Sequence, residues 1–252
     1  MDLATYLRYR LECDGVKLDT ERVEFEDFLA FLDLEHYLGL AGSDTWSRDG
    51  NETQVLVKTL IGQILTERTP PAHKLPQLYY NFAQQLGPGD VVLTFNYDTV
   101  LERAMEHVGR PYRLFPSRYE EVQDGTGIVD SSYEDEMVLL KLHGSVDWFD
   151  RTSYSNLERS CAKFGSTFVP LHPIFGPRAK VQVEPILEGP QFDDDPLRTV
   201  YRVFRGLERF YADSPRYQAT PYLLRLEAKR SMPIDSGISG GEWVRRVART
   251  WD

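Results

Sequence analysis

The sequence predicts an α/β fold in which helices flank a mainly parallel sheet. Residues 91–96 and 138–142 are apolar runs of strand length without polar alternation, which is typical of parallel strands covered by helices on both faces. Helical stripes alternate with these runs along the chain, as in α/β domains. Both runs stop at polar side chains, and ligands of open parallel sheets bind beyond the carboxyl ends of the strands. The number of strands is low for such a fold.

Three helices are predicted before the first strand. Apolar side chains recur at helical spacing in residues 21–40, where acidic residues lie between them, and again in residues 55–65. A third stripe, at residues 75–86, runs into Gly87-Pro88-Gly89-Asp90. We interpret this glycine pair as a helix stop and a turn, because a strand rather than a helix follows it.

After the first strand, residues 100–108 predict another helix, ended near Gly109. Residues 116–136 are rich in turn and acidic residues and are expected to form a loop, followed by the strand at 138–142. Residues 150–196 contain many turn residues and short apolar pieces. We predict a helix over residues 197–207, because Asp193-Asp194-Asp195-Pro196 precedes an apolar stripe there.

The Pro, Gly and Ser content rises beyond Asp213, and residues 243–251 suggest one more helix. We therefore divide the chain into a main α/β domain, residues 1–212, and a C-terminal tail, residues 213–252. A chain of 252 residues is long enough to bury a full hydrophobic core.

Composition excludes several classes of function. The formal net charge is −10, which argues against a general binder of nucleic-acid backbones. The two cysteines, Cys13 and Cys161, lie too far apart for a paired zinc module or a disulfide framework. No apolar run has the length of a membrane span, and the N-terminus has no signal-like pattern. We expect a cytoplasmic protein with no membrane and no nucleic-acid partner.

Polar residues end the first predicted strand. Asn96 and Asp98 lie two positions apart in Thr94-Phe95-Asn96-Tyr97-Asp98, so both can face one crevice. Helix capping is an alternative explanation, because Thr99-Val100-Leu101-Glu102 matches a capping box and Asp98 also suits a cap. For Asn96 the alternative is a buried amide that bonds to backbone groups.

His143 ends the second predicted strand, directly before Gly144, a residue that permits close backbone approach. Its position opposite the other polar strand end favours a functional residue over a structural one. The remaining histidines, His36, His73, His107 and His172, are assigned to surface or loop positions. No spacing of ligand residues predicts a metal, and no phosphate loop is present.

These two motifs resemble those of the sirtuin superfamily. Thr94-Phe95-Asn96-Tyr97-Asp98 resembles its Thr-x-Asn-hydrophobic-Asp motif, and Lys141-Leu142-His143-Gly144-Ser145 resembles its His-Gly motif. With Trp148-Phe149 after the histidine motif, the sequence is most similar to sirtuin-like domains of bacterial anti-phage defence proteins, over residues 21–210. The resemblance implies a Rossmann-like domain that binds NAD as its substrate and hydrolyses it to nicotinamide and ADP-ribose.

The resemblance also implies roles for individual residues. Asn96 would contact the nicotinamide ribose and help place water, Asp98 would bind the carboxamide, and His143 would be the base near the ribose hydroxyls. The remaining NAD-contacting residues implied by the resemblance are Thr94, Gly144 and Ser145. Nicotinamide leaves as a neutral molecule, so the reaction mainly requires stabilisation of an oxocarbenium-like transition state and a positioned water. A histidine of near-neutral pKa can relay the proton.

The chain departs from the family pattern at two places. Residues 1–30 contain no Gly-Ala-Gly-x-Ser loop, the usual cradle for the NAD diphosphate, and Gly15 is the only glycine there. Where the family has Gly-Tyr-Ser-x-Pro, the chain reads Ala212-Asp213-Ser214-Pro215. From these two departures we expect a truncated or decayed domain whose sheet is incomplete at the N-terminus, which also explains the low number of strands. Either the start codon lies upstream, or the protein no longer binds NAD well. Deacylation is the less favoured enzyme reaction, because sirtuin deacylases carry a four-cysteine zinc module.

Two other hypotheses stay open. The chain can be a non-catalytic module that binds NAD or ADP-ribose, or a partner protein, and that has lost turnover. It can also be a decayed product without an independent fold, which would show as weakly cooperative unfolding. A protein partner and a homo-oligomer are both compatible with the sequence.

Overall fold

The computed structural model describes residues 52–152, 155, 159, 162–163, 181–213 and 220–223, except Asp124, Tyr133 and Pro196. In chain order the elements are α3 (Glu52–Arg68), η1 (Ala72–Lys74), α4 (Gln77–Gln85), β1 (Val91–Thr94), α5 (Val100–Val108), β2 (Tyr112–Arg113), β3 (Tyr119–Gln123), β4 (Thr126–Val129), β5 (Met137–Lys141), β6 (Gly144–Asp150), β7 (Gln182–Pro185), β8 (Val200–Arg205), α7 (Leu207–Asp213) and β9 (Thr220–Leu223). The predicted helices at 21–40 and 243–251 lie outside the described residues.

The helices α3, α4 and α5 confirm the predictions for residues 55–65, 75–86 and 100–108. A local signal ends α5. At the end of α5, Gly109 takes a left-handed conformation with φ 70°, and the next amide, of Arg110, donates to the carbonyl of Met105 at 2.8 Å. Glycine has no Cβ to oppose this conformation, which closes the last helical turn.

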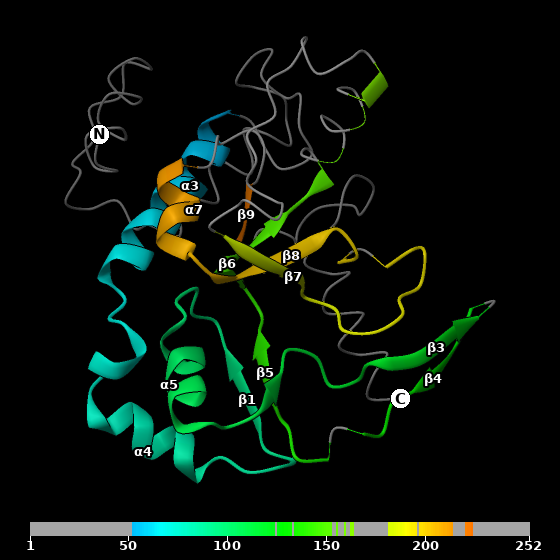
Figure 1. Ribbon diagram of the computed structural model, residues 1–252, viewed down its shortest axis with the longest axis horizontal. Coiled ribbons are helices and arrows are strands. Elements are labelled where there is room, and N and C mark those ends of the chain that lie inside the picture. Colours follow the sequence, from blue (N-terminus) through cyan, green and yellow to red (C-terminus); the bar gives the residue numbers. More distant parts are fainter. Residues whose placement is uncertain are drawn as a thin grey trace, which may run out of the picture.

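Among the described residues, a three-stranded parallel sheet in the order β1-β5-β2 forms the centre of the α/β fold; Figure 1 shows β1 beside β5. All five residues of β5 are buried. Met137 and Leu139 pack in one cluster with side chains of α4 and α5, whereas Val138 and Leu140 pack in another with Trp148. The prediction of a parallel strand covered on both faces is therefore confirmed for residues 138–142.

The same prediction is wrong for β1. Val92 packs against the cluster formed by α4 and α5, but Val91 and Leu93 on the opposite face are 44% and 51% exposed. In the described part of the chain β1 pairs with β5 alone and is an edge strand. The apolar run resembles a central strand in composition, yet the described structure covers only one of its faces.

A second, antiparallel sheet in the order β7-β8-β6-β9 follows directly from the first. The chain leaves β5 at Lys141, turns at Leu142 and His143, and enters β6 at Gly144, whose φ is 81°. Every residue of β6 is buried. Side chains of α3, α7, β6 and β8 form one hydrophobic cluster; its members include Val57, Ile61, Val146, Phe149, Val203, Phe210 and Tyr211. The sequence analysis did not identify β6 as a strand.

Two other predictions about local structure are wrong. Residues 116–136, expected as a loop, contain the antiparallel hairpin β3–β4, which extends away from the parallel sheet (Figure 1). Residues 197–207, expected as a helix, contain β8, and α7 begins only at Leu207. The apolar spacing there fits a helix, but pairing of β8 with β6 and β7 buries Val200 and Val203 in a sheet instead.

The strand β9 lies in the segment that the sequence analysis assigns to a C-terminal tail, and it pairs with β6 in antiparallel orientation. The division at residues 212 and 213 stays a prediction. Within the described residues, no helix combines the length and the apolar character that crossing a membrane requires.

Candidate functional site

The carboxyl ends of β1 and β5 lie side by side. Thr94 is paired with Lys141 in the parallel register, so the chain leaves both strands at the same edge of the sheet. Residues 95–98, here called the Asn96 turn, follow β1. Residues 142–145, here called the His143 turn, follow β5. The structure therefore brings the two sequence motifs together, as expected for the carboxyl edge of a parallel sheet.

Backbone hydrogen bonds join the two turns. The amide of Leu142 donates to the carbonyl of Thr94 at 3.0 Å, and the amide of Val146 donates to the carbonyl of Tyr97 at 2.9 Å. One carbonyl before the Asn96 turn and one within it thus accept amides from the His143 turn and from β6. The relative position of the motifs is fixed by the backbone.

His143 is half-buried and lies against aromatic rings of the Asn96 turn. Its ring centroid is 5.0 Å from that of Phe95, in an edge-to-face arrangement, and 5.9 Å from that of Tyr97. These two residues flank Asn96 in the sequence. The imidazole is therefore packed against the turn that carries the amide.

Asn96 itself is exposed, and its backbone amide donates to the hydroxyl oxygen of Thr94 at 3.1 Å. The alternative of a buried amide bonded to backbone groups is therefore wrong. An exposed amide after an apolar strand is placed where it can contact a ligand. Its direct role stays a prediction.

Helix capping explains the presence of Asp98 in the Asn96 turn. The carboxylate of Asp98 accepts a hydrogen bond from the amide of Val100 at 2.9 Å, so Asp98 does stabilise the start of α5. The predicted capping box is not formed, because the side chain of Thr99 makes no capping hydrogen bond. Glu102, its expected partner, bonds to Lys141 instead.

A buried ion pair lies beneath the turns. The Nζ atom of Lys141 is 2.6 Å from Oε1 of Glu102, and the two side chains are 1% and 7% exposed. Burial raises the pKa of Glu102, and the charge of Asp147 raises it further, while the ammonium of Lys141 opposes both. Lys141 also donates to the carbonyl of Asp98. The sequence analysis missed this pair, although a lysine within a buried apolar run was its signal.

Gly144 and Ser145 are buried in the described structure. The hydroxyl of Ser145 donates to the carboxylate of Asp147 and lies 3.3 Å from the carbonyl oxygen of Tyr97. These partners within the chain indicate that Ser145 supports the turn. A contact of NAD with Ser145, Gly144 or Thr94 stays a prediction. Asp147, which is also buried, was not identified from the sequence.

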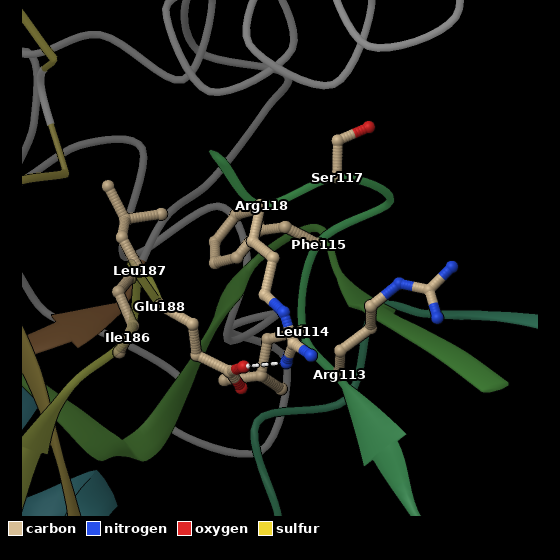
Figure 2. A pocket seen from close by; sticks show the side chains of 8 residues that line it. All are labelled: Arg113, Leu114, Phe115, Ser117, Arg118, Ile186, Leu187 and Glu188. Carbon is tan, nitrogen blue, oxygen red and sulfur yellow. Dashed lines mark hydrogen bonds and ion pairs between the residues drawn. The ribbon is translucent and has the colours of Figure 1, made fainter. Parts of the chain in front are cut away.

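Two cavities lie away from the turns. Figure 2 shows the first, between residues 113–118 and 186–188, where Arg118 and Glu188 form an ion pair of 2.6 Å. Its volume is about 10 Å³, roughly the space of one water molecule. The second, of about 350 Å³, lies between Tyr112, Glu184, Gln191 and Arg202. None of Asn96, Asp98 and His143 lines either cavity.

Arg202 lines the larger cavity and has partners within the chain. Its guanidinium contacts Glu184 at 2.5 Å and donates to the hydroxyl of Tyr112 at 2.9 Å. Among the residues that the structure describes, no group of three or more His, Cys, Asp or Glu side chains is arranged to hold a metal ion.

The fold and the joined turns define an α/β domain with a candidate site at the carboxyl edge of its parallel strands. Residues 90–168 match the family model of the SIR2-like domain, a segment that contains both motifs. The sirtuin-like resemblance is therefore confirmed for this part of the chain, and SIR2-like domains use NAD. No curated protein matches the chain.

Proposed function

We propose that this chain is a sirtuin-like NAD glycohydrolase that cleaves NAD to nicotinamide and ADP-ribose in bacterial anti-phage defence. The observation that supports the proposal most is the packing of the His143 ring against both neighbours of Asn96, inside the segment that matches the SIR2-like domain. An amide and an imidazole at one sheet edge provide two groups that hydrolysis of the N-glycosidic bond of NAD needs: one to orient water and one to accept a proton.

The proposed reaction begins with loss of nicotinamide. The bond between C1′ of the ribose and the pyridinium nitrogen breaks, and its electron pair neutralises the nitrogen. Asp98 holds the carboxamide of the leaving nicotinamide through the carboxylate that also accepts the amide of Val100. Because the leaving group is neutral, no acid is required, and the transition state has oxocarbenium character.

Water then attacks C1′. Asn96 orients the water beside the ribose, and His143 accepts the proton that the water loses as its oxygen bonds to C1′. The edge-to-face contact with Phe95 and the contact with Tyr97 limit the orientations of the imidazole. An oriented general base contributes about 10²- to 10⁴-fold to the rate of such a step.

A second candidate is a non-catalytic module that binds NAD or ADP-ribose, or that docks on a protein partner. The openness of the Asn96 turn favours it: Asn96 is exposed, and Phe95 beside it is 51% exposed. Hydrolases stabilise charge best in enclosed sites from which water is excluded. The apolar face of β1, next to this turn, gives such a partner an apolar surface to contact.

Measurement of nicotinamide release from NAD by the purified chain tests the proposal. We expect release by the wild type, and at least about a 100-fold loss of rate for His143→Ala and for Asn96→Ala. His73→Ala is the matched control, because His73 is exposed and lies in η1, outside the motifs. Binding of ADP-ribose without release would favour the second candidate. Release that survives both motif substitutions would reject the assigned residues.

A further inference from the structure

We propose that Lys141 and Glu102, the buried pair, position the Asn96 turn against β5. The inference rests on the proposed function, because the turn matters as the carrier of Asn96 and Asp98. It assigns a supporting role to two residues that themselves lie beneath the surface and do not reach a substrate. They act through the backbone of Asp98.

Hydrogen bonds to three backbone carbonyls hold the segment that leads from β1 to α5. Those of Thr94 and Tyr97 accept backbone amides of Leu142 and Val146, whereas that of Asp98 accepts the ammonium of Lys141. The third contact lies at the far end of the turn. Without it, the described hydrogen bonds would fix the turn only up to Tyr97 and leave the backbone of Asp98 to the cap of α5.

Glu102 determines where the ammonium lies. It is the third residue of α5, faces inward, and accepts from Nζ of Lys141 at 2.6 Å. The lysine side chain therefore joins the start of α5 and the end of the Asn96 turn to β5. A single ammonium thus contacts the last residue of the Asn96 turn and the helix that follows it.

Stability alone does not account for this pair. Burial of two charges has a large desolvation cost, and replacement of a buried ion pair by apolar residues of similar size is often neutral or stabilising. Breaking such a pair by removing one partner is strongly destabilising, because the other charge stays buried alone. A role in setting the conformation of the turn gives the pair a function that apolar side chains cannot provide.

Four variants separate positioning from simple stability: Lys141→Met, Glu102→Met, the double variant, and Arg118→Met. The last is the control, because Arg118 forms a 2.5 Å ion pair with Asp130 in another part of the fold. For each protein we would measure the urea midpoint, nicotinamide release, ADP-ribose affinity, and hydrogen exchange of the Asn96 and Val100 amides. These amides bond to Thr94 and Asp98.

We expect each single variant to lose stability and the double variant to regain the wild-type urea midpoint. The double variant should still exchange both amides at least ~10-fold faster and release nicotinamide at least ~10-fold more slowly, through a lower kcat rather than a higher KM. Arg118→Met should leave exchange and turnover unchanged. A double variant that regains stability, exchange protection and turnover together would overturn the proposal.

Two results keep the test decisive in other cases. If the wild type neither releases nicotinamide nor binds ADP-ribose, the proposed function fails, while hydrogen exchange still reports on the buried pair. If the double variant does not fold, hydrogen exchange of the Val100 amide in the wild-type protein tests whether the turn is held. Protection of Val100 comparable to that of the β5 amides supports a held turn, and exchange at the rate of an unstructured peptide refutes it.

Discussion

Gly62 gives a direct test of how the antiparallel sheet supports the motif turns. This glycine of α3 faces Tyr211 of α7, and a Cβ at position 62 would overlap the hydroxyl and ring of Tyr211. The buried Tyr211 hydroxyl donates to the carbonyl of Val146 in β6. The amide of Val146 in turn donates to Tyr97, in the Asn96 turn.

The expected cost of Gly62→Ala follows from three terms. Overpacking a tight contact costs about 1–3 kcal/mol, and a carbonyl of Val146 left without its partner costs about 1–3 kcal/mol. Alanine in place of glycine within a helix returns about 1 kcal/mol. The sum is a net loss of about 3 kcal/mol, although helix propensity alone predicts a gain.

Urea unfolding measures this loss as a change in the free energy of unfolding at constant slope. Gly87→Ala is the matched control, because Gly87 lacks a positive φ and a Cβ there would meet nothing closer than 3.8 Å. We expect the control to be neutral or stabilising, by up to about 1 kcal/mol. A Gly62→Ala variant as stable as the wild type would show that Tyr211 does not pack on α3 as described.

The remaining predictions concern burial and pH. Leu139→Ala, in the fully buried β5, should lower the free energy of unfolding by about 2–5 kcal/mol, whereas Leu93→Ala, half-exposed on β1, should cost less than about 1 kcal/mol. Equal losses in urea unfolding would mean that the outer face of β1 is covered. Burial raises the pKa of Glu102 above its ordinary value of 4.5. Between pH 4.5 and that higher pKa, Glu102 therefore carries a proton in the folded state that it has lost in the unfolded state. The stability of the wild type relative to Glu102→Gln should therefore fall as pH rises from 4.5, and a difference that grows with pH would contradict this direction.

Local sequence patterns sufficed for α5 and β5. The stripe of α5 ends at a glycine, and β5 is an apolar run buried on both faces, so pattern and environment agree. The pattern failed for β8, whose apolar residues have helical spacing but pair with β6 and β7. Sheet pairing between distant segments cannot be inferred from the spacing within one of them.

The sequence predicted where the candidate site lies, but not which buried residues lie beneath it. Two polar strand ends sufficed to place Asn96 and His143 at one edge of the sheet. The partnership of Lys141 with Glu102 joins residues 39 positions apart, and the sequence instead suggested that Glu102 completes a capping box. Whether the outer face of β1 is exposed depends on the positions of distant segments, so it is a property of the tertiary structure.

We propose that the Asn96 turn and the His143 turn bind one sugar nucleotide together. Titration of ADP-ribose into isotopically labelled protein, followed by NMR of the Asn96 side-chain amide and the His143 imidazole, tests this shared binding. Both signals should shift with a single saturation curve, while the ring of His73 should not respond. Shifts confined to the cavity around Tyr112 and Arg202, with both turns unaffected, would contradict it.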